Sequence, residues 1–220
     1  MTPRKRNKVE AKETMLLVCA LESEAVFFSQ MRKDCRYSNL TVVTAKSDSL
    51  EKFIDAAAKE KSNGKYSVCW ALFGFEDVNT DADEVKAMMP YAEKKKVNLC
   101  FFNPTFDLYF MMFATKPRAF ISDKDMIRAR VQSAFDGYDG SAEYFLTKGL
   151  NLNFKIYPQL AEADKNARDY NNIAEIDTGI VATSLPLFFD SLKSRLDCFF
   201  IFTGYFISFR KSFHSIFYCF

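Results

Sequence analysis

Residues 66–73 read YSVCWALF, and the run is apolar at almost every position. A strand that is apolar on both faces is typical of the centre of a parallel sheet that helices cover on each side. The polar turn Gly74-Phe75-Glu76-Asp77 follows directly and leads to a helix-like segment. The runs Met15–Leu21 and Val97–Phe102 have the same form and also end at polar turns. Because ligands of open α/β sheets bind at the carboxyl ends of strands, polar residues from three distant turns are expected to meet at one edge.

Strand-like and helix-like segments alternate from residue 14 to residue 114. Leu40–Ala45 supplies a fourth strand-like run. Between the strands, apolar residues recur at helical spacing, which predicts helices at Ser23–Lys33, with Ser23 as N-cap, Leu50–Lys61 and Thr80–Lys95. This alternation predicts an α/β fold, in which a mostly parallel sheet of about four strands is flanked by helices.

After Thr115 the pattern becomes entirely helical. The predicted helices are Asp123–Phe135, Ala142–Lys148, Pro158–Asn171 and Leu185–Leu196. We expect them to form a helical C-terminal extension packed on the sheet layer. The chain would then hold one domain at 14–196, with an α/β core at 14–114 and the extension at 115–196, preceded by a flexible basic arm at 1–13.

Composition narrows the class of protein. Of the 220 residues, 49% are hydrophobic and 26% are charged, which is typical of a soluble globular protein. The net charge of +2 gives no global reason to bind nucleic acid. Six cysteines without a Cys-x-x-Cys pair, and a single histidine, argue against a zinc site. The glycines form no phosphate-binding loop, and the N-terminal arm lacks the apolar segment of a secretory signal, so a cytoplasmic location is expected.

The last part of the chain, residues 197–220, contains eight phenylalanines. Its longest uncharged stretch is too short to span a bilayer as a helix. Three interpretations stay open: a segment that covers the sheet edge or core, a tail that binds a membrane surface or a partner, and a tail without a selected role. If it were exposed, such a segment would promote aggregation.

Four acidic residues follow two of the predicted strands: Glu22 and Glu24 after the first, and Glu76 and Asp77 after the central one. Carboxylate oxygens are the ligands that Mg²⁺ and Mn²⁺ prefer, and such a metal can stabilise the charge of a reacting phosphodiester. The competing interpretation is that acids at helix starts only complement the helix dipole.

The segment Asn103-Pro104-Thr105-Phe106-Asp107 follows the last strand of the core. Asn103 is placed either to cap the next helix or to bind a ligand, and Asp107 faces the same end of that helix one turn later. Arg128 and Arg130 lie on the helix after Ser122 and are candidates to bind a nucleic-acid backbone. The alternatives are an ordinary capped helix and a solvated basic helix face.

Three segments together resemble the RloB family, whose core is related to the TOPRIM fold. In the first, Cys19, Ser23-Glu24 and Phe27-Phe28 match that family's strand–turn–helix motif. In the second, Phe73, Glu76 and Asp77 match a strand that ends in Phe-Asp-x-Asp-Asp. The third is the most specific and matches the family's Ser-Asn-Pro-x-Phe-Glu-Leu-Trp segment. The segments read LLVCALESEAVFFSQM (16–31), VCWALFGFEDVN (68–79) and LCFFNPTFDLYFMMF (99–113).

The resemblance implies a magnesium-dependent nuclease of a phage-defence system that acts on DNA or RNA, possibly tRNA, beside an AAA-type ATPase, with homo-oligomers possible. It implies catalytic roles for Glu22, Glu24 and Asp107. The implied metal ligands are Glu24, Glu76 and Asp77, with Mg²⁺ or Mn²⁺ as the cofactor. Asn103, Arg128 and Arg130 would contact the nucleic acid.

Two of the family's acidic residues are missing from this sequence, and a family tyrosine-lysine pair near Tyr138 is broken because Asp139 follows it. Ala20 stands where the family has its first glutamate, and Gly74 stands where it has its first aspartate. Losing a proton-transfer group alone typically lowers a rate by about 10²–10⁴-fold, so weakened catalysis is expected. The alternatives are a relative that binds nucleic acid or a partner without cleaving, and an unrelated α/β interaction protein.

Overall fold

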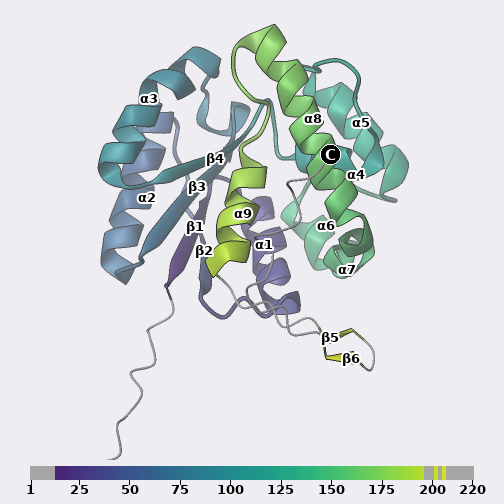
Figure 1. The fold of residues 1–220 in the computed structure, drawn as a ribbon, viewed down its shortest axis with the longest axis horizontal. Helices are drawn as coiled ribbons and strands as arrows, with labels where there is room; N and C mark the ends of the chain where they lie inside the picture. The colour runs from purple at the N-terminus through teal and green to yellow at the C-terminus, as the bar shows by residue number, and fades with distance from the viewer. Residues whose placement is uncertain (1–12, 196–200, 203–204, 207–220) are drawn as a thin grey trace, which may run out of the picture.

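The computed structural model describes residues 13–195, 201–202 and 205–206. It confirms the predicted α/β class: four strands form an all-parallel sheet in the order β2-β1-β3-β4 (Figure 1). The strands are β1 (Met15–Cys19), β2 (Leu40–Thr44), β3 (Val68–Gly74) and β4 (Asn98–Phe102). The register places Leu17 opposite both Val42 and Trp70, so that β1 and β3 form the buried centre of the sheet.

Helices cover both faces of this sheet (Figure 1). On one face, α2 (Leu50–Gly64) and α3 (Ala82–Lys95) bury Phe53 and Val85 against Phe73 of β3. On the other face lies α1 (Glu22–Asp34), together with helices of the C-terminal part. Because side chains alternate across a strand, β3 contributes to the hydrophobic core on each face of the sheet. Phe73 packs on the face that α2 and α3 cover, and Trp70 and Leu72 pack on the face that α1 covers.

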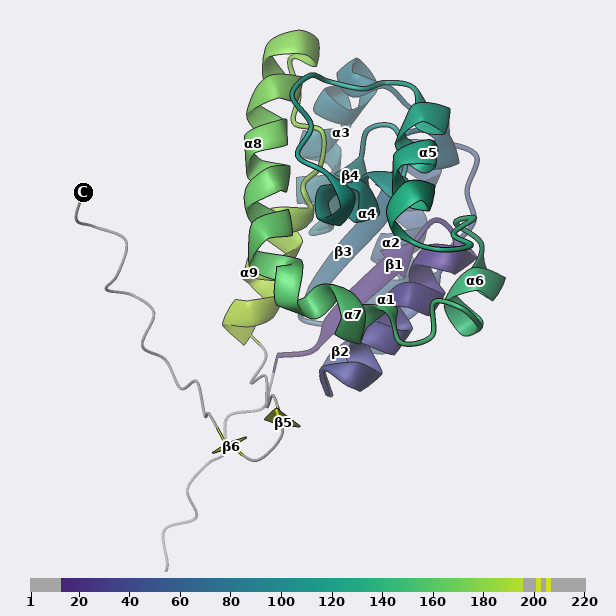
Figure 2. The same cartoon turned by 90° about the vertical axis from the view of Figure 1, so that its right-hand side faces the viewer.

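The helical extension is present and packs on the α1 face, as expected. Figure 2 shows α4 between α5 and α8, and α4 packs against both of them. The elements are α4 (Asp107–Ala114), α5 (Lys124–Ala134), α6 (Ala142–Leu146), α7 (Leu152–Ile156), the 3₁₀ turn η2 (Tyr157–Gln159), α8 (Leu160–Thr178) and α9 (Leu185–Arg195). Helix α8 runs beyond the predicted end at Asn171 and stops where Gly179 adopts a φ of 70°.

The start of α1 differs from the prediction. The N-cap is Leu21, and the predicted cap, Ser23, lies inside the helix. Glu24, the third helical residue, accepts a hydrogen bond from the Leu21 N–H and so satisfies a donor at the helix start from within the helix. The helix at Thr80–Lys95 agrees closely with α3, which Asp81 caps by accepting from the backbone N–H groups of Asp83 and Glu84.

Two predicted segments fall largely outside the described residues. These are the basic arm, of which only Glu13 is described, and the tail, of which a short antiparallel pair is described: β5 (Ile201–Phe202) with β6 (Tyr205–Phe206). Within the part of the chain that the structure describes, no helix has the length and apolar character needed to cross a membrane.

Candidate functional site

The carboxyl edge of the sheet gathers the acidic residues that the strand ends predicted. Glu24 follows β1, Glu76 and Asp77 follow β3 in the 3₁₀ turn η1 (Glu76–Val78), and Asp107 opens α4 after β4. Burial, followed by the negative charge of Asp77, raises the pKa of Glu24. Burial also raises the pKa of Asp77, with smaller contributions from the charges of Glu76 and Asp107. We call these four residues the acidic rim.

Glu24 is completely buried, and its two carboxyl oxygens differ. Oε2 accepts from the Leu21 N–H at 3.0 Å, whereas Oε1 finds no hydrogen-bond partner among the described residues. Burial, followed by the charge of Asp77, raises the pKa of this carboxyl well above its usual value. A buried oxygen without a partner is costly, which makes Oε1 a place where a ligand or water would be stabilised.

Glu24→Gln tests this environment through pH. The pKa of Glu24 is higher in the folded protein than in the unfolded chain, whose usual value is about 4.5. Between that value and the folded-state pKa, the folded protein keeps a proton that the unfolded chain releases. The free energy of unfolding therefore falls as the pH rises through the folded-state pKa. Glutamine has no such loss, and we expect the variant to be more stable than the wild type at pH 8 but not at pH 4. Urea unfolding at both pH values measures this, with Glu22→Gln, exposed on the same helix, as control. An equal effect at the two pH values would contradict the prediction.

Asp77 is half-buried beside the end of β3. Its Oδ2 accepts from the Gly74 N–H at 2.8 Å. Burial raises the pKa of Asp77, and the hydrogen bond from the Gly74 N–H opposes that increase more than the charge of Lys124 does. A Cβ at Gly74 would lie 2.6 Å from this Oδ2 and 3.0 Å from backbone atoms of Pro104 and Thr105. The aspartate that the resemblance places at position 74 would therefore require the Asp77 side chain to move and the Pro104–Thr105 backbone to shift slightly.

Thr105 adds a second unsatisfied group at this edge. Its Cα lies 3.0 Å from where a Cβ would lie if Gly74 were replaced. Its Oγ1 is buried without a hydrogen-bond partner in the described part of the chain. Asn103, two residues earlier, is half-buried and donates its backbone N–H to the carbonyl of Ala182 at 2.8 Å. The turn after β4 is thus fixed by backbone bonds, while Thr105 leaves a polar atom unpaired.

Asp107 is buried, and both of its oxygens are occupied. Oδ1 accepts from the Tyr138 hydroxyl at 2.6 Å, and Oδ2 accepts from Arg128 Nε at 2.7 Å. Gly140, with a φ of 75°, allows the close approach, because a Cβ there would lie 2.8 Å from the Arg128 guanidinium. Burial raises the pKa of Tyr138 well above its usual value, with a further contribution from the charge of Asp107.

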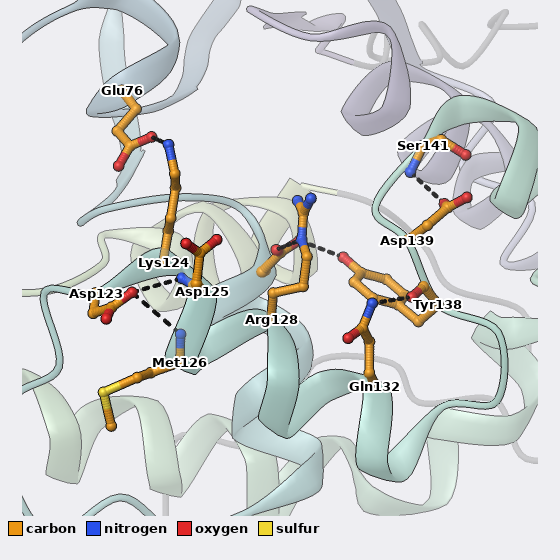
Figure 3. A network of polar contacts seen from close by, with 11 residues as sticks. Glu76, Asp123, Lys124, Asp125, Met126, Arg128, Gln132, Tyr138, Asp139 and Ser141 are labelled. Carbon is orange, nitrogen blue, oxygen red and sulfur yellow. Dashed lines mark hydrogen bonds and ion pairs between the residues drawn. The ribbon is translucent and has the colours of Figure 1, made fainter.

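Glu76 pairs with Lys124 at 2.6 Å, and both side chains are about half exposed. Lys124 and Arg128 lie one turn apart on α5, and their side chains extend on the same side of the helix (Figure 3). Sequence reasoning missed Lys124 and assigned no role to Tyr138 at Asp107. No local pattern marks either residue, because they come from segments 48 and 31 positions away from their partners.

Two predicted site residues lie elsewhere. Glu22 is exposed and lines a surface groove between α1 and β2, with Lys33 and Thr44. Burial raises the pKa of Tyr170 on α8, and the charge of Arg130 partly opposes that increase, so Arg130 acts away from the rim. Residues two apart on a helix face different directions, which explains why Arg128 and Arg130 separate.

The acidic rim offers part of a ligand set for a divalent cation. Within the described residues, no three acidic, cysteine or histidine side chains are arranged as a complete metal-ligand set. Mg²⁺ usually binds through one or two carboxylates together with waters and substrate phosphates, so a complete protein cage is not required. Asp77 and the unpartnered Oε1 of Glu24 fit this kind of partial site.

The fold places the chain among four-stranded parallel α/β domains with a helical extension. Comparisons with known protein families, with curated proteins and with solved structures gave no match in any of the three.

Proposed function

We propose that the protein acts on nucleic acid as a magnesium- or manganese-dependent hydrolase of phosphodiesters, with weakened activity. The single observation that carries the proposal is the acidic rim, where the carboxyl groups of Glu24, Asp77 and Asp107 follow three parallel strands of one sheet and Glu24 Oε1 is buried without a hydrogen-bond partner among the described residues. Repulsion among carboxylates at a sheet edge is relieved by binding a cation. A role in phage defence beside an AAA-type ATPase belongs to the same proposal and rests on the resemblance alone.

In this proposal Asp77 and Glu24 would hold the metal, and the buried Thr105 Oγ1 would be a further polar atom at the same edge. Such an ion, when bound, polarises a phosphodiester oxygen and stabilises the charge that develops on it. Glu76 and Asp107 contribute negative charge from further out, since each is already paired with a cation of α5. No acidic residue stands at position 20, so proton transfer to the leaving group is the step that we expect to be slow.

A second candidate function is binding of nucleic acid without cleavage. Two observations favour this candidate. Lys124 and Arg128 already neutralise two of the rim carboxylates, and Gly74 lacks the carboxylate that the family has there, with Asp77 Oδ2 only 2.6 Å from where its Cβ would lie. Because Lys124 and Arg128 already neutralise part of the rim's negative charge, binding a metal there would relieve less repulsion.

Metal binding is expected to raise the melting temperature. At a Mn²⁺ concentration of about ten times Kd, binding stabilises a protein by roughly 1.4 kcal/mol, which for this chain length corresponds to roughly 3–6 °C. Differential scanning fluorimetry with Mg²⁺ and Mn²⁺ measures the shift. Asp77→Asn should abolish it. Asp83→Asn, an equal change of charge at a side chain that is 94% exposed on α3, should retain it.

Labelled DNA and tRNA then separate the two candidates. Metal-dependent cleavage that disappears in Asp77→Asn supports the hydrolase. Binding of either nucleic acid with no cleavage supports the second candidate. If there is neither a metal-induced shift nor binding of nucleic acid, both are wrong, and an α/β interaction protein becomes the better interpretation.

A further inference from the structure

The helix α5 presents two cations directly to the acidic rim. Lys124 Nζ lies 2.6 Å from Glu76 Oε2, and Arg128 Nε lies 2.7 Å from Asp107 Oδ2. The two side chains are 54% and 45% exposed, so solvent and ligands can reach both of them. Arg128 uses only its Nε in the bond to Asp107, which leaves its terminal nitrogens available to an incoming acceptor.

We propose that Lys124 and Arg128 form the phosphate-binding pair of the rim, and that they become available to a nucleic-acid backbone when a divalent cation takes their place beside the carboxylates. This inference rests on the proposed function, because it uses the same metal site. It adds a binding role for α5 that couples the metal to the substrate.

The charges of the rim explain why metal and phosphate would bind together. Glu76 and Asp107 each pair with one cation of α5, and the carboxyl group of Asp77 beside them adds a surplus of negative charge, which repels a phosphate. A divalent cation removes that surplus and weakens the hold of Glu76 and Asp107 on the two side chains of α5. The buried Glu24 Oε1, which has no partner among the described residues, is a second and independent indication that a ligand belongs at this edge.

Linkage then requires each ligand to tighten the binding of the other by the same factor. In the wild type, a single-stranded 12-nucleotide DNA should bind more tightly as Mn²⁺ is added, and Mn²⁺ should bind more tightly when the DNA is present. Fluorescence anisotropy measures the first affinity, and free Mn²⁺ measured by electron paramagnetic resonance gives the second.

The double variant Lys124→Ala/Arg128→Ala should move the two affinities in opposite directions. Mn²⁺ should bind several-fold more tightly, because its competitors for the carboxylates are gone. The DNA should bind roughly tenfold more weakly at saturating Mn²⁺, and the salt slope of log K should fall by about 1.4, which corresponds to two lost phosphate contacts on a single strand. Misfolding would weaken both affinities, so this pattern identifies the proposed role.

A matched control removes two cations that pair elsewhere. Lys116 pairs with Asp169, and Arg168 pairs with Asp164 and Asp190, all at the surface of the extension. Lys116→Ala/Arg168→Ala should leave both affinities and the salt slope unchanged. If the rim double variant does not fold, Lys124→Ala alone loses only a half-exposed pair and should show the same opposite changes with a smaller size.

The outcomes separate this inference from the proposed function. If the wild type binds Mn²⁺ and DNA with no coupling, or a rim variant that circular dichroism shows to be folded changes both affinities in one direction, the inference is wrong and the hydrolase stands. Coupled binding without cleavage supports the inference and contradicts the hydrolase. If neither ligand binds, both are wrong. Inorganic phosphate that displaces the DNA at micromolar concentration would assign the pair to free phosphate and overturn a nucleic-acid role.

Discussion

Phe27→Ala is expected to lower the free energy of unfolding by about 3–5 kcal/mol, the usual cost of removing a fully buried aromatic side chain. Phe27 is completely buried in α1 and packs where the helix meets the extension. Its ring centroid lies between 5.1 and 5.8 Å from those of five other rings, mostly in edge-to-face geometry. These rings belong to Phe28, Phe106, Tyr109, Phe110 and Phe145.

The control for this prediction is Phe154→Ala on α7, where the side chain is 62% exposed. It should change stability by less than about 0.5 kcal/mol, as surface substitutions usually do. Urea unfolding followed by circular dichroism measures both variants. If Phe27→Ala lost no more than the control, α1 would not depend on the extension for its packing, and the two parts could unfold separately.

The sheet could be predicted from sequence because its signal is local. Each central strand is a run such as YSVCWALF that is buried on both faces, and each strand end carries its own polar turn. Parallel topology then brings the turns to one edge without further information, which is why Glu24, Asp77 and Asp107 were predicted to lie together. The pKa effects among these residues are consistent with that placement.

The rest of the site could not be predicted because it depends on packing between segments far apart in the chain. Lys124 and Arg128 reach the rim only because α5 packs against α4. The N-cap of α1 was misassigned for a related reason: Ser23 has the right chemistry, but Glu24 at the third helical position satisfies the helix start from inside the core. A buried carboxylate there overrides the local preference for serine.

Removing the carboxylate of Asp107 is expected to lower the free energy of unfolding by about 2–4 kcal/mol. Asp107→Ala leaves the Tyr138 hydroxyl buried without its acceptor and takes away the partner of Arg128. Most of the loss should come from Tyr138, which is 2% exposed, because Arg128 can turn toward water. Urea unfolding at pH 7 and low salt measures the effect.

Tyr138→Phe separates the two contributions, because it removes only the hydroxyl and should cost about 1–2 kcal/mol. The opposite outcome is informative, since Asp107 also raises the pKa of Asp77 through like-charge repulsion. If Asp107→Ala left stability unchanged or increased it, repulsion within the rim would outweigh the bonds to Tyr138 and Arg128. Asp107 would then be a residue that lowers the stability of the protein, as functional carboxylates often do. That result would favour a role for Asp107 in the metal site over a role that is only structural.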